Sequence, residues 1–153
     1  MLASFVALSL VVTPAADPPK EKKAELSAEA KKELKKLEGK WQLVKLVTKD
    51  QEVEPGDSEM VFAFEGDTLS VTVAGQKETV AVTALDATTD PKCIDLTRTR
   101  PGRPAQVSEG VYKLDGDTLT IANTPNGEKL RPAGFDKPTD ERVQVLTFKR
   151  VKK

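Results

Sequence analysis

The sequence predicts an all-β protein, an antiparallel β-barrel of eight or nine strands preceded by one short N-terminal helix. Two observations lead to this prediction. From Gly39 onward, hydrophobic residues recur with a period of two, and the short apolar runs follow one another at regular spacing. Only one helical pattern, over residues 27–38, precedes them. Because no second helical pattern interrupts the strands, parallel βαβ units are not expected.

The expected strands are short and closely spaced, as in an antiparallel barrel or sandwich. They cover residues 40–48, 58–64, 67–74, 77–84, 93–98, 109–114, 117–122, 128–131 and 142–150. The chain has 153 residues, which is the length of one domain.

The first residues have the pattern of an export signal. "MLASFVALSLVV" is apolar from Leu2 to Val12 apart from two serines, and the small residues of "TPAAD" follow. We therefore expect a signal peptide over residues 1–16 and an exported protein, periplasmic or extracellular. A buried N-terminal strand is the alternative interpretation. The apolar run is too short for a stable membrane span, and a linker rich in Pro and Lys over residues 17–26 follows it.

The segment "LSAEAKKELKKLEG" predicts the helix. Ser27 is a favourable N-cap residue, and Gly39 is a typical helix terminator. The apolar residues that fall on one face at helical spacing are Leu26, Ala30, Leu34 and Leu37.

A gap-free repeat links two parts of the predicted barrel. Residues 58–71 are "SEMVFAFEGDTLSV" and residues 108–121 are "SEGVYKLDGDTLTI", with seven of fourteen positions identical. "DGDTLT" resembles the start of a calcium loop, but Leu119 and Asn126 stand where that loop needs oxygen ligands. We therefore interpret the repeat as architecture, two equivalent β-hairpins, without a shared ligand.

The turn residues predict a register for both hairpins. "EG" at 65–66 and "DG" at 115–116 are expected to be two-residue loops of the type that joins antiparallel strands tightly. Opposed residues share one face of a sheet. The opposed pairs in this register are Phe62 with Leu69, Phe64 with Asp67, Tyr112 with Leu119, and Leu114 with Asp117.

Composition argues against several classes of function. Lys plus Arg and Asp plus Glu are 24 each, so the chain has no net charge that would attract nucleic acid or an anionic membrane. The chain has no His, which is the commonest acid–base catalyst and metal ligand. We therefore predict no catalytic residue, no metal site and no cofactor. Twenty-four carboxylates make some pairing inevitable, so pairing alone does not indicate an enzyme.

Two further features allow more than one interpretation. Cys93 is the single cysteine and cannot form an internal disulfide. In an exported protein its thiol could pair between chains, or it could be half-buried beneath a neighbouring loop. The loop "TRTRPGRPAQ" holds Arg98, Arg100 and Arg103. These guanidinium groups could hold an anion by paired hydrogen bonds, although solvated loop arginines are more common.

The segment "EGKWQLV" resembles the lipocalin signature, in which Gly-x-Trp opens the first strand after a short helix. Trp41 is the only Trp, and "TFKRVKK" offers Arg150 near the end of the last strand. The resemblance implies that Trp41 closes one end of an eight-stranded barrel and that Arg150 packs across its ring. A guanidinium on an indole is favourable by roughly 1 kcal/mol.

Taken together, the motifs resemble the small lipocalin-like domain family of unknown function that is abundant in planctomycete bacteria. They are "LEGKWQLV", "FEGDTL", "DPKCIDL", "EGVYKLDGDTLTI", "LRPAGF" and "LTFKR". The resemblance covers Leu37 to Arg150 and implies a lipocalin-like barrel domain over residues 27–153, helix included. Asp95 and Arg131 lie in two of these motifs, and we expect them to be structural partners, since partly buried charges need one.

The resemblance implies a lipocalin-like barrel and often an export signal, but it supplies no activity. Our leading hypothesis is an exported, non-enzymatic binding domain. An eight-stranded barrel either fills with side chains or holds one small ligand. A void lined by Phe62, Phe64, Tyr112 and Phe148 would favour binding of a small apolar molecule. A packed interior would instead favour a protein-interaction or structural module of the cell envelope, with an envelope protein as partner. An enzyme using carboxylates at the barrel mouth is the third possibility.

Overall fold

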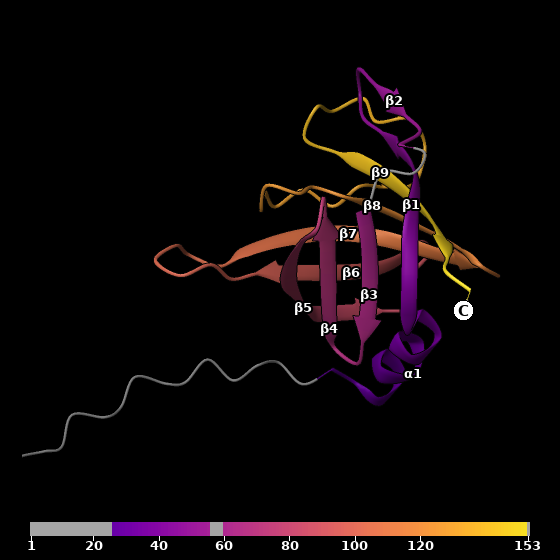
Figure 1. The fold of residues 1–153 in the computed structure, drawn as a ribbon, viewed down its shortest axis with the longest axis vertical. Coiled ribbons are helices and arrows are strands. Elements are labelled where there is room, and N and C mark those ends of the chain that lie inside the picture. The colour runs from indigo at the N-terminus through magenta and orange to yellow at the C-terminus, as the bar shows by residue number, and fades with distance from the viewer. Residues whose placement is uncertain (1–25, 56–59, 153) are drawn as a thin grey trace, which may run out of the picture.

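The computed structural model describes residues 26–55 and 60–152, which form a closed β-barrel with one helix at its end (Figure 1). The predicted signal peptide, 1–16, and all but the last residue of the predicted linker, 17–26, lie outside the described residues. The elements are α1 (Ala28–Leu37), β1 (Gly39–Val47), β2 (Glu52–Val53), β3 (Met60–Glu65), β4 (Thr68–Val73), β5 (Gln76–Asp86), β6 (Lys92–Arg98), β7 (Gln106–Asp115), β8 (Thr118–Asn123) and β9 (Gln144–Arg150).

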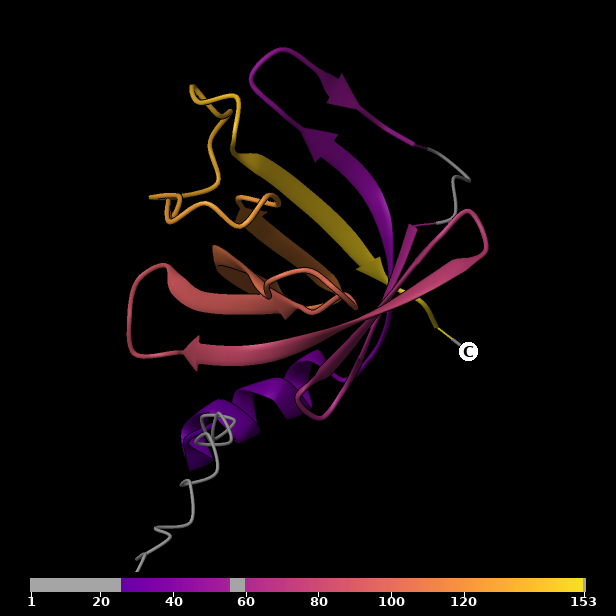
Figure 2. The same cartoon turned by 90° about the vertical axis from the view of Figure 1, so that its left-hand side faces the viewer.

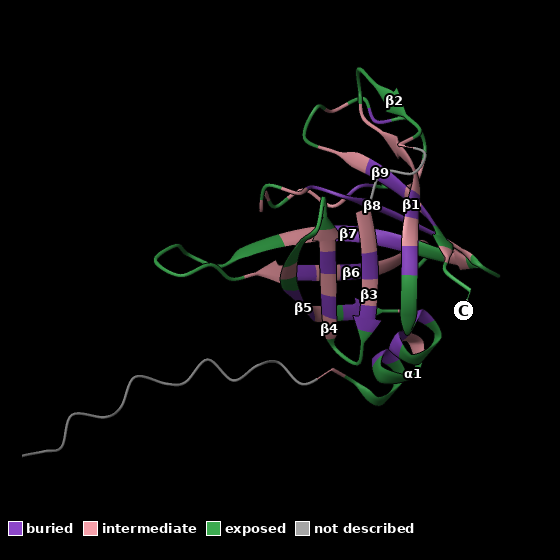
Figure 3. Ribbon diagram, in the orientation of Figure 1, coloured by how far each residue is buried: buried purple, intermediate pink, exposed green. Residues whose placement is uncertain are grey.

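Eight antiparallel strands close the barrel, as the sequence predicts. From β3 to β9 each strand pairs with the next one in the chain, and β1 pairs with both β3 and β9. Interior positions alternate with outer ones along the strands, and Figure 3 shows the buried residues as bands that cross the barrel. The period of two in the sequence therefore corresponds to alternation between the core and the outer face.

The two ends of the barrel are built differently. At the end near α1, which we call the closed end, β1 pairs with β3 over Gly39–Gln42. At the opposite end, the open end, β1 pairs instead with the two-residue strand β2, which the sequence pattern did not predict. A bulge between Leu43 and Lys45 shifts the register of β1 against β9. Figure 2 shows the open end of β1 curving away, with α1 below the opposite end.

The predicted hairpin register is wrong by two residues in both copies. Phe62 faces Val71 and Phe64 faces Leu69, so the loop is Gly66–Asp67 and not residues 65–66. The second loop is likewise residues 116–117 and not 115–116, because Tyr112 pairs with Ile121 and Leu114 with Leu119.

Glycine conformation explains this register. Gly66 has a φ of 59° and Gly116 a φ of 57°, and each is the first central residue of its turn. A glycine at that place is typical of a type II′ turn, whereas the predicted loops put it second, as in a type I′ turn. A shift of two residues keeps every side chain on its face. The predicted inward face, which includes Phe62 and Leu69, is therefore correct.

The segment between β8 and β9, residues 124–143, contains no strand, so the strand predicted at 128–131 is wrong. Both edges of β8 are already occupied, by β7 and β9, and no free edge remains for residues 128–131. This segment, which we call the strap, packs on the outside of the barrel. Phe135 contacts an outer cluster of Val111, Ala122 and Val145. The strap therefore adds a second, smaller apolar layer.

The helix α1 forms as the sequence predicts. The Ser27 side chain accepts a hydrogen bond from the backbone N–H of Ala30, which caps the first turn. Ala30, Leu34 and Leu37 are buried against the barrel core. The helix ends before Gly39, whose φ of 115° favours glycine and allows the chain to turn directly into β1.

Candidate functional site

The closed end is sealed by Trp41, which is fully buried. Its indole Nε1–H donates to the carbonyl of Leu37, the last residue of α1, over 2.8 Å. The guanidinium carbon of Arg150 lies 4.2 Å from the centre of the Trp41 ring. The geometry predicted for Trp41 and Arg150 from the lipocalin signature is therefore present.

Arg150 also holds the end of the helix. Its two Nη groups donate to the carbonyls of Glu38 and Lys36, over 2.8 and 2.9 Å. These carbonyls lie at the C-terminus of α1, where the negative end of the helix dipole attracts a cation. A Cβ on Gly39 would lie 3.3 Å from Arg150, so glycine leaves room for the guanidinium. One arginine thus joins the helix, the indole and the last strand.

A second polar cluster attaches α1 to the barrel. Glu33, which is mostly buried, accepts hydrogen bonds from Lys36, Lys92 and Tyr112. The two lysines, Lys36 first, hold the pKa of Glu33 below its ordinary value against the opposing effect of burial. Burial, together with the negative charge of Glu33, raises the pKa of Tyr112 above its ordinary value. Tyr112 is therefore a hydrogen-bond donor to the helix.

Asp95 and Arg131 are partners, as the sequence predicts. Arg131 Nη2 lies 2.7 Å from Asp95 Oδ1, and its Nη1 donates to the carbonyl of Gly110 over 2.7 Å. Desolvation lowers the pKa of Arg131, but the hydrogen bond and charge of Asp95 outweigh it and leave that pKa raised. Arg131 belongs to the strap, while Asp95 belongs to β6. The pair therefore attaches the strap to the barrel wall.

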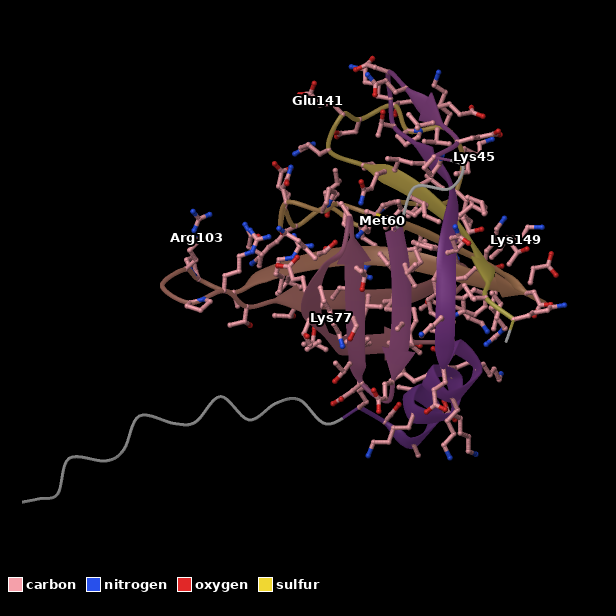
Figure 4. The ribbon with its side chains drawn as sticks, viewed as in Figure 1. Lys45, Met60, Lys77, Arg103, Glu141 and Lys149 are labelled. Carbon is pink, nitrogen blue, oxygen red and sulfur yellow. The ribbon has the colours of Figure 1, made fainter. Side chains whose placement is uncertain are left out.

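The candidate functional site is a cavity of about 130 Å³ in the open half of the barrel. One side of it is apolar and comes mainly from β1, β3, β4 and β5. The apolar lining residues are Leu46, Met60, Phe62, Leu69, Val71, Val80, Leu96, Pro125 and Leu146. Figure 4 shows Met60 at the end of β3 that is remote from α1. A cavity of about 150 Å³ holds a benzene-sized molecule, so this one suits a small ligand or part of a larger one.

The other side of the cavity is polar. Gln144 donates to the side-chain oxygen of Asn123 over 3.1 Å, and Asn123 donates to Ser108 over 2.9 Å. Ser108 in turn donates to the carbonyl of Thr124 over 2.8 Å. This chain of hydrogen bonds links β9, β8 and β7 across the wall. Gln106 and Arg98 complete the polar lining.

Arg98 brings a charge to the cavity wall. Its Nε lies 3.1 Å from a carboxylate oxygen of Glu78, whose other oxygen accepts from Arg100 Nε over 3.0 Å. Two of the three arginines that the sequence singled out therefore converge on one carboxylate. Arg103 lies at the tip of the β6–β7 loop, away from the barrel (Figure 4).

The four aromatic residues expected to line one void divide between the two halves. Phe62 lines the cavity, and its ring packs at a tilt of 36° against that of Phe148, with centres 4.3 Å apart. Phe148, Phe64 and Tyr112 are buried in the packed core. The cavity at the open end is therefore lined by only one of the four aromatic residues, and part of its lining is polar.

The polar lining was missed in the sequence, although a signal for it exists. Ser108 and Asn123 have the same strand parity as buried core residues of β7 and β8, such as Tyr112 and Ile121. Gln144 has the parity of Leu146 on β9. Polar residues at inward positions, all at the same ends of neighbouring strands, indicate a polar patch inside a barrel.

Cys93 is half-buried on the outer face and contacts the cluster beneath the strap, in line with the second of its two interpretations. It borders a shallow outer cavity of about 230 Å³ beside Asp95 and Arg131. Within residues 26–55 and 60–152, no three His, Cys, Asp or Glu side chains are grouped to hold a metal ion. The helix in this part of the chain is not long and apolar enough to cross a membrane.

Comparison with known proteins places the chain in a family. The family model described as a lipocalin-like domain matches residues 37–149, from the last residue of α1 to the residue before the end of β9. No curated protein and no solved structure matches the chain significantly. The match begins at Leu37, which accepts the hydrogen bond of Trp41, and includes every strand of the barrel. Because it covers well over half of the sequence, the protein belongs to the lipocalin-like domain family.

Proposed function

We propose that the protein is an exported, non-enzymatic binding domain that holds a small, largely apolar molecule in the open half of its barrel. The observation that carries this proposal is that one half of the barrel interior is packed while the other half holds a cavity. The closed half is filled by Trp41, Phe148 and their neighbours, whereas the open half keeps a cavity of about 130 Å³. Export rests on the apolar N-terminal segment of the sequence, and membership of the planctomycete group rests on the motif resemblance alone.

The lining of the cavity supports binding rather than catalysis. Over the described residues it consists of aliphatic and aromatic side chains, amides, a hydroxyl and one guanidinium. Apolar walls with a few placed polar groups are typical of small-molecule sites. The described lining holds no carboxylate, imidazole or thiol, the groups that most often act as general acid or base. The lipocalin-like family supports the same conclusion at the level of the fold.

Native mass spectrometry of the protein purified from its own host tests the proposal directly. We expect a co-purifying small molecule that is released on unfolding. The variant Val71→Phe should abolish it, because Val71 is buried and lines the cavity, and a phenyl ring would fill the space.

The matched control for this experiment is Thr72→Phe. Thr72 is the next residue along β4 and does not line the cavity, so its side chain points to the outer face and the same ring leaves the cavity open. Co-purification that is equal in both variants would show that the molecule binds elsewhere and would contradict the proposal.

A protein-interaction module of the cell envelope is the second candidate, favoured by one observation. Three exposed valines, Val53, Val73 and Val107, lie on strand ends at the open end of the barrel. If an envelope protein docks there, Val107→Glu should abolish its chemical cross-linking in the host. Val151→Glu, at an equally exposed valine beyond the closed end, should leave it unchanged.

A further inference from the structure

We infer that the ligand of the open cavity is an amphipathic carboxylate, with its anionic head at Arg98 and its apolar chain among the aliphatic side chains of the opposite wall. This inference rests on the proposed function and adds the chemical class of the ligand. The opposition of an apolar and a polar wall within one cavity points to a molecule with two unlike ends.

The amide groups of the polar wall can form hydrogen bonds with the polar head of a ligand, but they do not favour an anionic head over a cationic one. Asn123 and Gln144 each use one N–H in the hydrogen-bond chain. Each amide nitrogen carries two N–H groups, and in the described part of the chain the second of each has no acceptor. Gln144 also keeps its carbonyl oxygen. The amides can therefore bind an acceptor or a donor, and the selection must come from a charged group.

Arg98 is that charged group. Among the lining residues that the structure describes it is the one ionised side chain, and its side chain is 31% exposed. Its Nε is buried and makes no hydrogen bond of good geometry, although a Glu78 oxygen lies 3.1 Å away. Arg98 thus retains donor capacity at the cavity wall, and a guanidinium favours a planar carboxylate as its acceptor.

The charge count around Arg98 leads to the same conclusion. In the part of the chain that the structure describes, Arg98 and Arg100 share a single carboxylate, that of Glu78, so these three side chains carry a net charge of +1. An anionic head would neutralise this charge at the edge of an apolar space, where the low dielectric strengthens the attraction. A cationic head would meet like charge.

The size of the cavity limits the buried part of the molecule. At about 130 Å³ it is slightly smaller than the cavity of about 150 Å³ that accepts benzene. An apolar chain of about six carbons fits, and a longer chain would have to extend past Met60 toward the solvent. Hexanoate is therefore a suitable probe.

The test compares three six-carbon probes by isothermal titration calorimetry on the folded protein: hexanoate, 1-hexanol and hexylammonium. We expect hexanoate to bind about tenfold more tightly than 1-hexanol, the ratio that one charge-assisted hydrogen bond supplies. Hexylammonium should bind most weakly. In Arg98→Gln the preference for hexanoate should disappear while the affinity for 1-hexanol stays unchanged.

Arg103→Gln is the matched control, since it removes the same charge from the exposed loop tip and should keep the preference for hexanoate. If 1-hexanol binds as well as hexanoate, the inference fails and the proposed function stands. If none of the three probes binds and Val71→Phe also leaves co-purification unchanged, the proposed function itself fails. A preference for hexanoate that survives in Arg98→Gln would also overturn the inference.

Discussion

The closed and the open halves of this barrel use similar strands to opposite effect. In the closed half, the polar groups bind to one another and to the helix: Trp41 to Leu37, Arg150 to two helix carbonyls, and Glu33 to three donors. In the open half, amides and Arg98 line a cavity and retain hydrogen-bonding capacity. Satisfied polar groups stabilise a fold, whereas polar groups with spare capacity beside an apolar cavity are suited to binding.

The comparison also suggests how the protein divides stability from function. In the closed half, the helix, the indole and the fully buried Phe148 belong to one packed core. The open end is bounded by the short strand β2 and the loops, where strand pairing is incomplete. We therefore expect substitutions in the closed half to affect the free energy of unfolding, and substitutions in the open half to affect ligand affinity.

The largest effect that this comparison predicts is the loss of Trp41. Trp41→Ala removes a fully buried indole and its hydrogen bond to Leu37, and it leaves Arg150 without its stacking partner. Large-to-small changes of this kind cost roughly 3–5 kcal/mol. The free energy of unfolding, measured by urea titration with circular dichroism, should fall by that amount.

If Trp41→Ala is too unstable to measure, Trp41→Phe keeps an aromatic ring but removes the N–H donor, and should show a smaller loss. A loss of less than about 1 kcal/mol in the free energy of unfolding for Trp41→Ala would show that the stability of the closed end does not depend on the buried indole. The division between the two halves would then have to be abandoned.

Much of the closed half could be predicted from the sequence because its determinants are local or carried by motifs. Ser27 and Gly39 mark the helix ends, and the Gly-x-Trp motif together with the final Arg150 predicts the stacked pair. The inward face of the hairpins was also correct, although their register was shifted by two residues. That error arose because the glycine of each loop can be either the first or the second central residue of a two-residue turn. The pairing of the flanking strands shows that it is the first.

The open half was less predictable for a physical reason. The size of the cavity depends on how far β1 and β3 diverge, which follows from the bulge near Lys45 and the pairing with β2, and not from a local pattern. The contact of Arg98 and Arg100 with Glu78 joins residues twenty or more positions apart. Such contacts follow from the tertiary arrangement, so the arginine loop alone did not reveal them.

The next effect in size concerns Glu33 and its dependence on pH. The pKa of Glu33 in the folded protein lies below its ordinary value of 4.5. A lowered pKa stabilises the folded state above the unfolded pKa, and this contribution disappears as the pH falls through the folded pKa. Glu33→Gln should therefore cost about 1–2 kcal/mol at pH 7, as lost hydrogen bonds to a charged group do. The two proteins should become equally stable as the pH falls well below 4.5.

Urea titrations of both proteins between pH 7 and pH 3 measure this convergence. Glu29→Gln is a suitable control, because Glu29 lies one turn earlier on the exposed face of α1. A difference between wild type and Glu33→Gln that stays constant over the whole range would show that charge plays no part in attaching the helix.

The smallest expected change in stability comes from Met60 in the open half. Met60 is half-buried at the end of β3 and already borders the cavity, so truncation enlarges a space that exists and creates little new void. We expect Met60→Ala to cost at most about 1 kcal/mol, below the 2–5 kcal/mol of a fully buried methionine. The affinity of this variant for 1-hexanol should fall by a larger factor than its stability, because the Met60 side chain is part of the apolar lining of the cavity. Urea titration and calorimetry on the same preparation measure both quantities. If Met60→Ala destabilised the fold as much as Trp41→Ala and left 1-hexanol binding intact, the open half would be a structural core like the closed one, and the cavity would lose its assigned role.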